Sequence, residues 1–235
     1  MKKTIIEAKK VNKIFTTGNN IVHALNNVSF KIKEGELTVI TGYSGSGKST
    51  LLNALGCLLE VDSGSIIVNS NDITKFNEKE KNNYRKKEIS IIFQNYNLLN
   101  DLTIYENALL GKKITNTNVN IESIFKMLDL HNRMNHYPME LSGGEQQRAS
   151  IVRSFCKGGN IFLCDEPTGA LDVENGKKVL KYLQILAKNE NKAVIIITHN
   201  DLVTLSADHI IVMKDGKIIE DRYNKDPLDI EKVSW

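Results

Sequence analysis

The stretch Gly42-Tyr43-Ser44-Gly45-Ser46-Gly47-Lys48-Ser49 fits the pattern G-x-x-x-x-G-K-[ST], which indicates a phosphate-binding loop. It follows Glu36–Thr41, a short run of β-forming residues, and it leads into Ser49–Leu59, which has helical apolar spacing. A strand, a glycine-rich turn and a helix in this order are the context that such a loop requires. The stretch therefore predicts an α/β fold that binds a nucleotide phosphate at this turn.

The residue types of this loop suit a polyphosphate anion. Glycines let successive backbone N–H groups point at one anion, and the positive end of the following helix attracts the same charge. We expect Lys48 to reach the β- and γ-phosphates of the nucleotide and the Ser49 hydroxyl to bind Mg²⁺. Such a loop alone fits GTPases, kinases, helicases and ABC proteins alike. A purely structural glycine-rich turn is the alternative, which the flanking elements disfavour. The predicted nucleotide-binding residues are Gly42, Tyr43, Ser44, Gly45, Ser46, Gly47, Lys48, Ser49 and Thr50.

Two carboxylates, Asp165 and Glu166, follow the apolar run Ile161–Cys164, which predicts a strand buried on both faces. Ligands of open parallel sheets bind beyond the carboxyl ends of the strands. Adjacent carboxylates are costly there unless a cation or a reacting water uses them. We therefore predict that Asp165 holds Mg²⁺, directly or through water, and that Glu166 polarises the attacking water. A surface acidic pair that caps a helix is the alternative, which the nearby phosphate loop disfavours.

The composition limits the classes of protein to which this chain can belong. The 235 residues, 41% hydrophobic and 25% charged, fit one α/β domain or two small ones. The net charge is only +3, and we interpret the lysine-rich segment 79–87 as a solvated helix face rather than a nucleic-acid or acidic-lipid patch. No nucleic acid is expected as a partner.

The cellular location of the chain is predicted from two sequence features that it lacks. No apolar run approaches the roughly 18–20 residues that cross a bilayer, and no apolar signal core follows the basic N-terminus. We expect a cytoplasmic chain. Its three cysteines, Cys57, Cys156 and Cys164, are odd in number and lack metal-ligand spacing, which favours buried free thiols in a reducing compartment.

The order of elements predicts the architecture. Strand and helix patterns alternate along most of the chain, which favours a mainly parallel sheet with helices on both faces. Residues 95–155 contain no convincing strand, whereas Ile121–Leu130 and Glu145–Cys156 have helical patterns, so this segment is predicted to be a helical subdomain. The pair Asp215-Gly216 indicates a hairpin near the C-terminus.

A second motif, Leu141-Ser142-Gly143-Gly144-Glu145-Gln146-Gln147-Arg148, resembles the signature of the ABC ATPase family, Leu-Ser-Gly-Gly-Gln or a close variant. The hydroxyl of Ser142 and the exposed N–H groups of Gly143 and Gly144 at a helix start form another phosphate-binding device. One nucleotide cannot easily use both devices within a compact monomer. The resemblance implies a head-to-tail dimer in which each ATP lies between one subunit's phosphate loop and the other's signature.

Further family motifs follow in the expected order. The resemblance implies that Gln94 touches Mg²⁺ and the attacking water, that Asp172 crosses the dimer interface and that His199 contacts the γ-phosphate. It also implies that Phe15 stacks on adenine, although a lone aromatic residue is more often part of a core. The family usually has Tyr at that position, and its common Pro before Ser63 is absent here.

The segments Ala24–Phe30 and Asp165–Asp172 are similar to the branch of the family that serves lipoprotein release and the export of macrolides and peptide antibiotics. The implied fold is a single α/β domain: a P-loop NTPase core of the RecA-like kind with an antiparallel β flank, and a helical subdomain inserted after Gln94. The core is expected at about 1–94 and 156–235, and the subdomain at about 95–155.

The resemblance also implies the activity and the partners. We expect an ATPase that powers a separate integral membrane permease from the cytoplasmic face of the membrane, for export of or resistance to peptide, lipid-linked or antibiotic compounds. Two alternatives stay open: an ATPase that changes a membrane protein's shape without transport, and a soluble ABC ATPase that acts on DNA or ribosomes. The second is disfavoured because a coiled-coil insertion or a second ATPase domain would not fit 235 residues.

A surface for the permease is predicted after Gln94. The segment 95–102 carries Leu98, Leu99 and Leu102 beside turn-forming residues that should keep it near the surface. In the family, this segment helps line a groove for a short cytoplasmic helix of the permease. Simple packing of the three leucines within the helical subdomain is the alternative.

Overall fold

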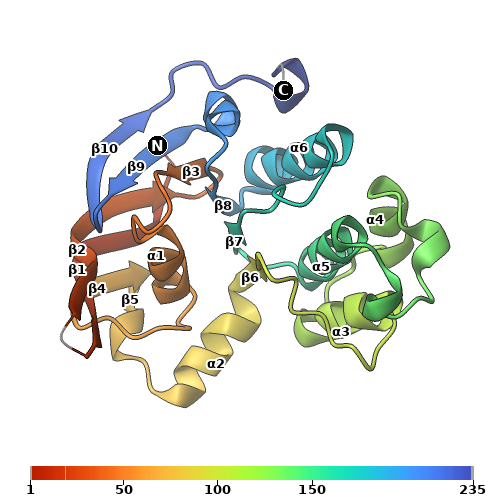
Figure 1. The fold of residues 1–235 in the computed structure, drawn as a ribbon, viewed down its shortest axis with the longest axis horizontal. Helices are drawn as coiled ribbons and strands as arrows, with labels where there is room; N and C mark the ends of the chain where they lie inside the picture. Colours follow the sequence, from red (N-terminus) through yellow and green to blue (C-terminus); the bar gives the residue numbers. More distant parts are fainter. Residues whose placement is uncertain (1, 19, 234–235) are drawn as a thin grey trace.

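The computed structural model describes residues 2–18 and 20–233, and Figure 1 shows its two sheets with their helices. One sheet has six strands in the order β10-β9-β3-β8-β7-β6. Its strands are parallel except β10, which forms an antiparallel hairpin with β9. The strands are β3 (Leu37–Thr41), β6 (Ile89–Ile92), β7 (Ile161–Asp165), β8 (Ala193–Ile197), β9 (His209–Lys214) and β10 (Lys217–Tyr223).

The second sheet is antiparallel and forms the predicted flank. Its order is β2-β1-β4-β5, with β1 (Thr4–Thr17), β2 (Asn20–Lys33), β4 (Ser63–Val68) and β5 (Asn71–Asp72). The first two strands extend well beyond the predicted Thr4–Lys9 and Val28–Ile32. Their pairing shifts register between Ala8 and Val11, so the alternation of apolar residues that predicts a strand is interrupted there.

Two apolar cores cover the two faces of the parallel sheet. Successive side chains of a strand point to opposite faces. Accordingly, Phe162 and Cys164 of β7 join one core, and Ile161 and Leu163 join the other. The strand is therefore apolar throughout because both of its faces are buried, as the sequence predicted.

Helices complete the layers (Figure 1). Helix α1 (Lys48–Leu55) lies in the core shared by the two sheets, where Leu51, Leu52 and Leu55 are fully buried. The other core unites the sheet with α5 (Gly143–Lys157), α6 (Val173–Glu190), α3 (Ile104–Thr115) and α4 (Ile121–Met127). Helix α2 (Glu78–Lys87) precedes β6, and five 3-10 turns lie at Ile73–Lys75, His131–Arg133, Pro138–Glu140, Asp201–Ser206 and Ile230–Lys232.

Several predicted boundaries were wrong by a turn or less. Helix α1 ends at Leu55 rather than Leu59 because Gly56 follows as its C-cap, and α4 ends at Met127 rather than Leu130. Helix α3 was not predicted at all. Its buried face includes Asn107 and Gly111, so it lacks the continuous apolar stripe by which a helix is recognised.

The cysteines agree with the expectation of free thiols. All three cysteines are free thiols, with Cys156 and Cys164 buried and Cys57 half-buried. Within residues 2–18 and 20–233, no helix is both long enough and apolar enough to cross a bilayer.

Candidate functional site

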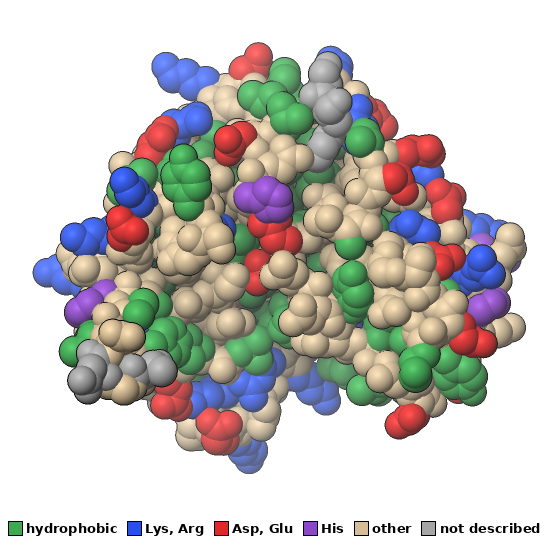
Figure 2. Space-filling model, in the orientation of Figure 1, with side chains coloured by type: hydrophobic (Ala, Val, Ile, Leu, Met, Phe, Trp, Pro, Cys, Tyr) green, Lys and Arg blue, Asp and Glu red, His purple; other side chains and the backbone are tan. Residues whose placement is uncertain are grey.

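A cavity of about 760 Å³ lies beyond the carboxyl ends of the parallel strands. On the face shown in Figure 2, a histidine and acidic side chains gather near the middle of the surface. The loops that follow β3, β6, β7 and β8 all contribute to the cavity wall. The predicted residues that line it are Phe15, Ser44, Gly45, Gly47, Lys48, Ser49, Thr50, Gln94, Asp165, Glu166 and His199.

Glycine is required at two positions of the phosphate loop. Gly47 has φ of 97°, and a Cβ there would lie 2.1 Å from the carbonyl oxygen of Ala24. A Cβ at Gly42 would lie 2.1 Å from the carbonyl oxygen of Met213. Only glycine fits both the left-handed backbone at Gly47 and these close approaches. The loop is thereby held against β2 and β9, and it delivers Lys48 as the first residue of α1.

The ammonium group of Lys48 lies inside the loop. Its Nζ donates to the carbonyl oxygens of Gly42 at 2.7 Å and Tyr43 at 2.8 Å, and the residue is 9% exposed. Burial lowers the pKa of Lys48, while the nearby charges of Glu166 and Asp165 oppose that effect. A desolvated cation at the start of a helix, surrounded by a glycine-rich turn, fits the phosphate groups of a nucleotide.

Asp165 and Ser49 stand together at the same edge of the sheet. Burial raises the pKa of Asp165, the hydrogen bond with Ser49 and the charge of Lys48 lower it, and the charge of Glu166 raises it. Among the described residues, no group of three or more His, Cys, Asp and Glu side chains is placed to hold a metal ion. One carboxylate and one hydroxyl suit Mg²⁺, which usually takes its other ligands from phosphate and water.

Glu166 has a backbone conformation that is unusual for a residue with a side chain. Its φ is 48°, in the left-handed region that disfavours a side chain. Its N–H donates to the carbonyl oxygen of Ile197 at 2.9 Å, and its Oε1 accepts from the N–H of His199 at 3.0 Å. The Glu166 side chain is 14% exposed and that of His199 is 77% exposed. The carboxylate is thus fixed inside the cavity while the imidazole faces outward.

Ser142, Gly143 and Gly144 of the signature motif lie outside this cavity. Ser142 caps α5: its Oγ donates to Oε2 of Glu145 at 2.8 Å, and the N–H of Glu145 donates back to the Oγ at 3.3 Å. Arg133 holds Glu145 by a 3.1 Å ion pair. The predicted residues that do not line the cavity are Gly42, Tyr43, Ser46, Ser142, Gly143, Gly144 and Asp172.

Those outlying residues have different environments. Tyr43 is 85% exposed, whereas Ser46 is buried and its Oγ accepts from Lys48 at 3.3 Å. Asp172 caps α6 by accepting from the N–H of Asn175 at 2.9 Å. The monomer therefore does not bring its own signature and its own phosphate loop around one ligand.

The cavity wall also contains residues that the sequence did not single out. Val22 lies opposite Phe15 in the β1–β2 pairing, and both line the cavity, so they form one apolar patch beside the phosphate loop. Gln147 follows Gly143 by one turn of α5 and lies in the wall of the same cavity. The two-residue alternation of β2 and the helical spacing of α5 were the signals that could have identified them. The remaining new lining residues are Ala24, Asn95, Tyr96, Gly169, Ala170 and Ile197.

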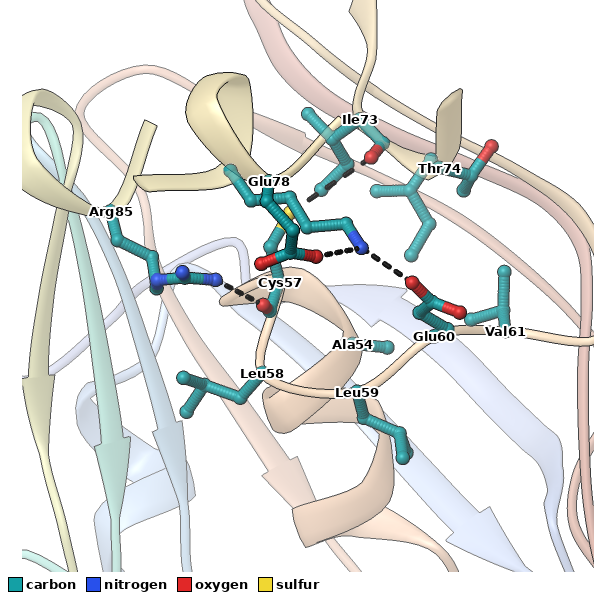
Figure 3. A pocket seen from close by; sticks show the side chains of 12 residues that line it. Ala54, Cys57, Leu58, Leu59, Glu60, Val61, Ile73, Thr74, Glu78 and Arg85 are labelled. Atoms are coloured by element: carbon teal, nitrogen blue, oxygen red, sulfur yellow. Dashed lines mark hydrogen bonds and ion pairs between the residues drawn. The ribbon is translucent and has the colours of Figure 1, made fainter. Parts of the chain in front are cut away.

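A separate cavity of about 420 Å³, drawn in Figure 3, lies beside α1 and α2 and includes none of the predicted site residues. Lys81 pairs there with Glu60 and Glu78, and Arg85 donates to the carbonyl oxygen of Cys57 at 2.6 Å. Its cationic groups already have partners within the cavity. The cavity beyond the sheet edge is therefore the better candidate for a nucleotide.

Comparison with known proteins agrees with this geometry. Residues 25–169 match the family described as ABC transporter. The chain is 42% identical over 222 residues to the macrolide export ATP-binding/permease protein MacB of Mannheimia succiniciproducens, covering 92% of this chain and 34% of that protein. It is 40% identical over 229 residues to MacB of Hahella chejuensis, covering 95% of this chain and 35% of that protein. The chain thus spans about a third of the length of these relatives.

Solved structures place the fold in the same family. The dimeric structure of MJ0796, a bacterial ABC transporter cassette, superimposes with a TM-score of 0.88 at 35% identity, covering 93% of this chain and 98% of that one. A post-hydrolysis dimer of the ATP-binding cassette MJ0796 with ADP and phosphate gives a TM-score of 0.86 at 34% identity, with the same coverage of each chain. The fold class, the antiparallel flank included, is confirmed. This chain belongs to the ABC transporter family, as an ATP-binding and ATP-hydrolysing cassette.

Proposed function

We propose that two copies of this chain bind ATP head to tail and that hydrolysis there drives an integral membrane permease from the cytoplasmic face of the membrane. One observation carries the proposal. The phosphate-loop cavity contains Lys48 and Glu166, whereas Ser142, Gly143 and Gly144 lie outside it. A phosphate-binding helix start that lies outside its own chain's cavity is suited to complete the cavity of a second copy.

The side chains divide the work of hydrolysis. Lys48 neutralises phosphate charge, and Glu166 accepts a proton from the attacking water. His199 keeps the Glu166 carboxylate oriented through two contacts to the same oxygen. Ser49, Gln94 and Asp165 would hold Mg²⁺, which when bound would neutralise further phosphate charge.

Around this centre, further residues bind the nucleotide. Phe15 and Val22 offer an apolar face of the β1–β2 hairpin for the adenine ring. The signature residues Ser142, Gly143 and Gly144 of the second copy close over the phosphates, and its Asp172 lies at the dimer interface. ATP therefore stabilises the closed dimer, and cleavage of its γ-phosphate releases it.

Coupling to the membrane is proposed to run through residues 95–155, which we treat as a helical subdomain between two parts of the core at 1–94 and 156–235. Gln94 lies in the nucleotide cavity at the start of this segment. A groove of about 670 Å³ lies between this segment and the core elements α2 and β6, and Leu99, Leu110 and Ile114 of the segment are partly exposed in it. The permease would dock a short helix in this groove.

The cargo is proposed from the relatives. The MacB proteins are described as macrolide exporters. Export of or resistance to peptide, lipid-linked or antibiotic compounds is therefore the first candidate for this chain and its permease. A mechanical ATPase that reshapes a membrane protein without transport is the second. Substrate-stimulated flux in vesicles that contain the reconstituted complex separates the two, because only transport produces flux.

Mixing two inactive variants tests the head-to-tail dimer. Lys48→Ala disables the phosphate loop, and Ser142→Arg disables the signature. In a mixed dimer, one of the two composite sites regains an intact loop and an intact signature. Since half of the dimers are mixed, about a quarter of the wild-type ATPase activity should return. No recovery on mixing would exclude a site shared between chains.

Pull-down with the permease tests the membrane partner. The chain should co-purify with an integral membrane protein, and that protein should stimulate ATP turnover. A chain that instead co-purifies with ribosomes or DNA would overturn the transporter proposal in favour of the soluble alternative.

A further inference from the structure

One buried amide, that of Gln147, connects the signature helix to the loop that carries Glu166. Gln147 is 1% exposed, and its Nε2 donates to the carbonyl oxygen of Pro167 at 3.2 Å. It stands one turn along α5 from Gly143 and lines the same cavity as Glu166. Pro167 directly follows Glu166 in the chain, so this hydrogen bond acts on the backbone next to the carboxylate.

A second contact lies beside the first. A Cβ placed at Gly144 would lie only 3.1 Å from the carbonyl oxygen of Ala170. The first turn of α5 therefore packs closely against the loop 167–170 at two points. Movement of the helix start cannot leave this loop unaffected, because packed backbone and a buried hydrogen bond resist separation.

The backbone of Glu166 needs such support. Its φ of 48° is unfavourable for a residue with a side chain, and proline at the next position restricts it further. A strained conformation of this kind persists only where the surroundings hold it. Three hydrogen bonds do so: Glu166 N–H to Ile197 at 2.9 Å, Gly169 N–H to Glu166 at 3.1 Å, and Gln147 to Pro167.

We infer that Gln147 is a positioning residue: it holds the Glu166 loop in its reactive geometry and makes that geometry depend on where the signature helix of the same chain sits. The inference rests on the proposed head-to-tail dimer. There, the signature of a chain touches one nucleotide, and Glu166 of that chain acts on the other. Gln147 thus links the two nucleotide sites through a single chain.

Gln147→Met tests the hydrogen bond, because methionine has a similar shape and no donor. We expect kcat for ATP to fall about 10-fold or more, since small misplacements of a catalytic group are costly. KM for ATP and the amount of ATP-dependent dimer should stay unchanged, because Gln147 contacts the loop rather than the phosphates.

Gln184→Met is the matched control. Gln184 of α6 is 4% exposed and also donates from a helix to a loop carbonyl, that of Leu228 at 3.0 Å, and its Oε1 accepts from the N–H of Ile230 at 3.4 Å. Its loss should lower the melting temperature at least as much as Gln147→Met does while leaving kcat unchanged. An equal fall in kcat for both variants would show a general structural effect and overturn the inference.

Gln147→Glu adds a second measurement, the pH dependence of kcat, which a change in packing alone would not alter. A carboxylate cannot donate to Pro167, whereas a carboxyl group can. Asp165, Glu166, Lys48 and His199 line the same cavity and are present in the wild type and in both variants, so the comparison is made relative to wild type. Relative to wild type at each pH, kcat of Gln147→Glu should rise above that of Gln147→Met as the pH falls from about 8 to about 6. Activity that stays at or below that of the methionine variant would contradict the inference.

Different results would overturn the proposed function and the inference about Gln147. If Glu166→Gln hydrolyses ATP at the wild-type rate, the proposed role of Glu166 fails, and the inference fails with it. If Glu166→Gln is inactive and mixed dimers regain activity while Gln147→Met has normal kcat, only the inference about Gln147 is overturned.

Discussion

The carboxylate of Glu166 and the imidazole of His199 meet at a single oxygen atom. Oε1 of Glu166 accepts from the backbone N–H of His199 at 3.0 Å and lies 2.8 Å from Nδ1 of its ring. The two residues follow adjacent parallel strands, β7 and β8, so the sheet itself brings them together. A carboxylate held by two contacts on one oxygen keeps its other oxygen available for a water molecule.

Glu166→Gln should retain ATP binding and slow hydrolysis by about 10²-fold or more, because glutamine keeps the shape but cannot accept the proton. Since the γ-phosphate then persists, the variant should accumulate as an ATP-bound dimer. Size-exclusion chromatography with saturating ATP, beside a phosphate-release assay, measures both effects. A variant that stays monomeric would remove Glu166 from this role.

Lys48→Ala should weaken ATP binding by about 10-fold to about 100-fold, because the phosphates lose a charged hydrogen-bond donor. The same change removes the donor to the Gly42 and Tyr43 carbonyls within the loop. Calorimetric titration with Mg²⁺ and ATP measures the affinity. Lys87→Ala, at an exposed position of α2, is the control. Equal affinities for the two variants would refute the phosphate-loop assignment.

Phe15→Ala should lower ATP affinity about 5-fold, from the loss of about 1 kcal/mol of stacking, and Phe15→Tyr should keep it. The side chain is 41% exposed and lines the cavity, so it is not a core aromatic. Ile14→Ala, at the neighbouring and opposite-facing position of β1, is the control. If Phe15→Ala and Ile14→Ala bind ATP equally well, adenine does not stack here.

Leu99→Asp and Leu98→Asp should have different effects, because the structure separates two residues that the sequence grouped together. Leu99 is 46% exposed in the groove, whereas Leu98 packs against the core. Leu99→Asp should weaken permease binding and permease-stimulated turnover while ATP affinity of the free subunit survives. Leu98→Asp should lower the melting temperature of the free subunit. Normal pull-down of the permease by Leu99→Asp would defeat the docking proposal.

Lys157 gives a prediction for pH dependence. Burial, with a smaller contribution from the charge of Arg153, lowers the pKa of Lys157 to about 8. A lysine side chain in an unfolded chain has a pKa of about 10.4. Between these two pKa values the unfolded chain binds a proton at Lys157 that the folded chain does not bind. The free-energy cost of burying the charged side chain is therefore present in full below about pH 8. It disappears as the pH rises, so the folded state becomes more stable.

The comparison with Lys157→Met isolates this effect. The melting temperature of wild type minus that of Lys157→Met should become more positive between about pH 8 and about pH 10. All other ionisable groups are common to the two proteins, so their contributions cancel in the difference. Thermal unfolding followed by circular dichroism at several pH values measures it, and a difference that is flat or falling across the window would contradict the lowered pKa.

Some elements of the fold escaped prediction for physical reasons. Helix α3 turns Asn107 inward, where its Nδ2 donates to three carbonyl oxygens, those of Leu99, Leu102 and Thr103. At Gly111 of the same helix, a Cβ would lie 2.5 Å from the carbonyl oxygen of Arg153. A buried face that includes hydrogen bonds and close backbone approach interrupts the apolar periodicity of this helix. The signal that remained was the pair Thr103 and Glu106, which form a capping box at the helix start.

The sequence by itself determined the chemistry of the phosphate loop. The glycines at 42 and 47, Lys48 and the pair Asp165-Glu166 are local features, and their neighbours in the chain suffice to predict a strand, a turn and a helix around them. Only the tertiary structure decided which distant residues share a cavity and which do not. Glu166 meets His199, and Gln147 meets Pro167, because the register of the parallel strands and the packing of α5 place them there. Such pairings depend on long-range burial, which no local pattern records.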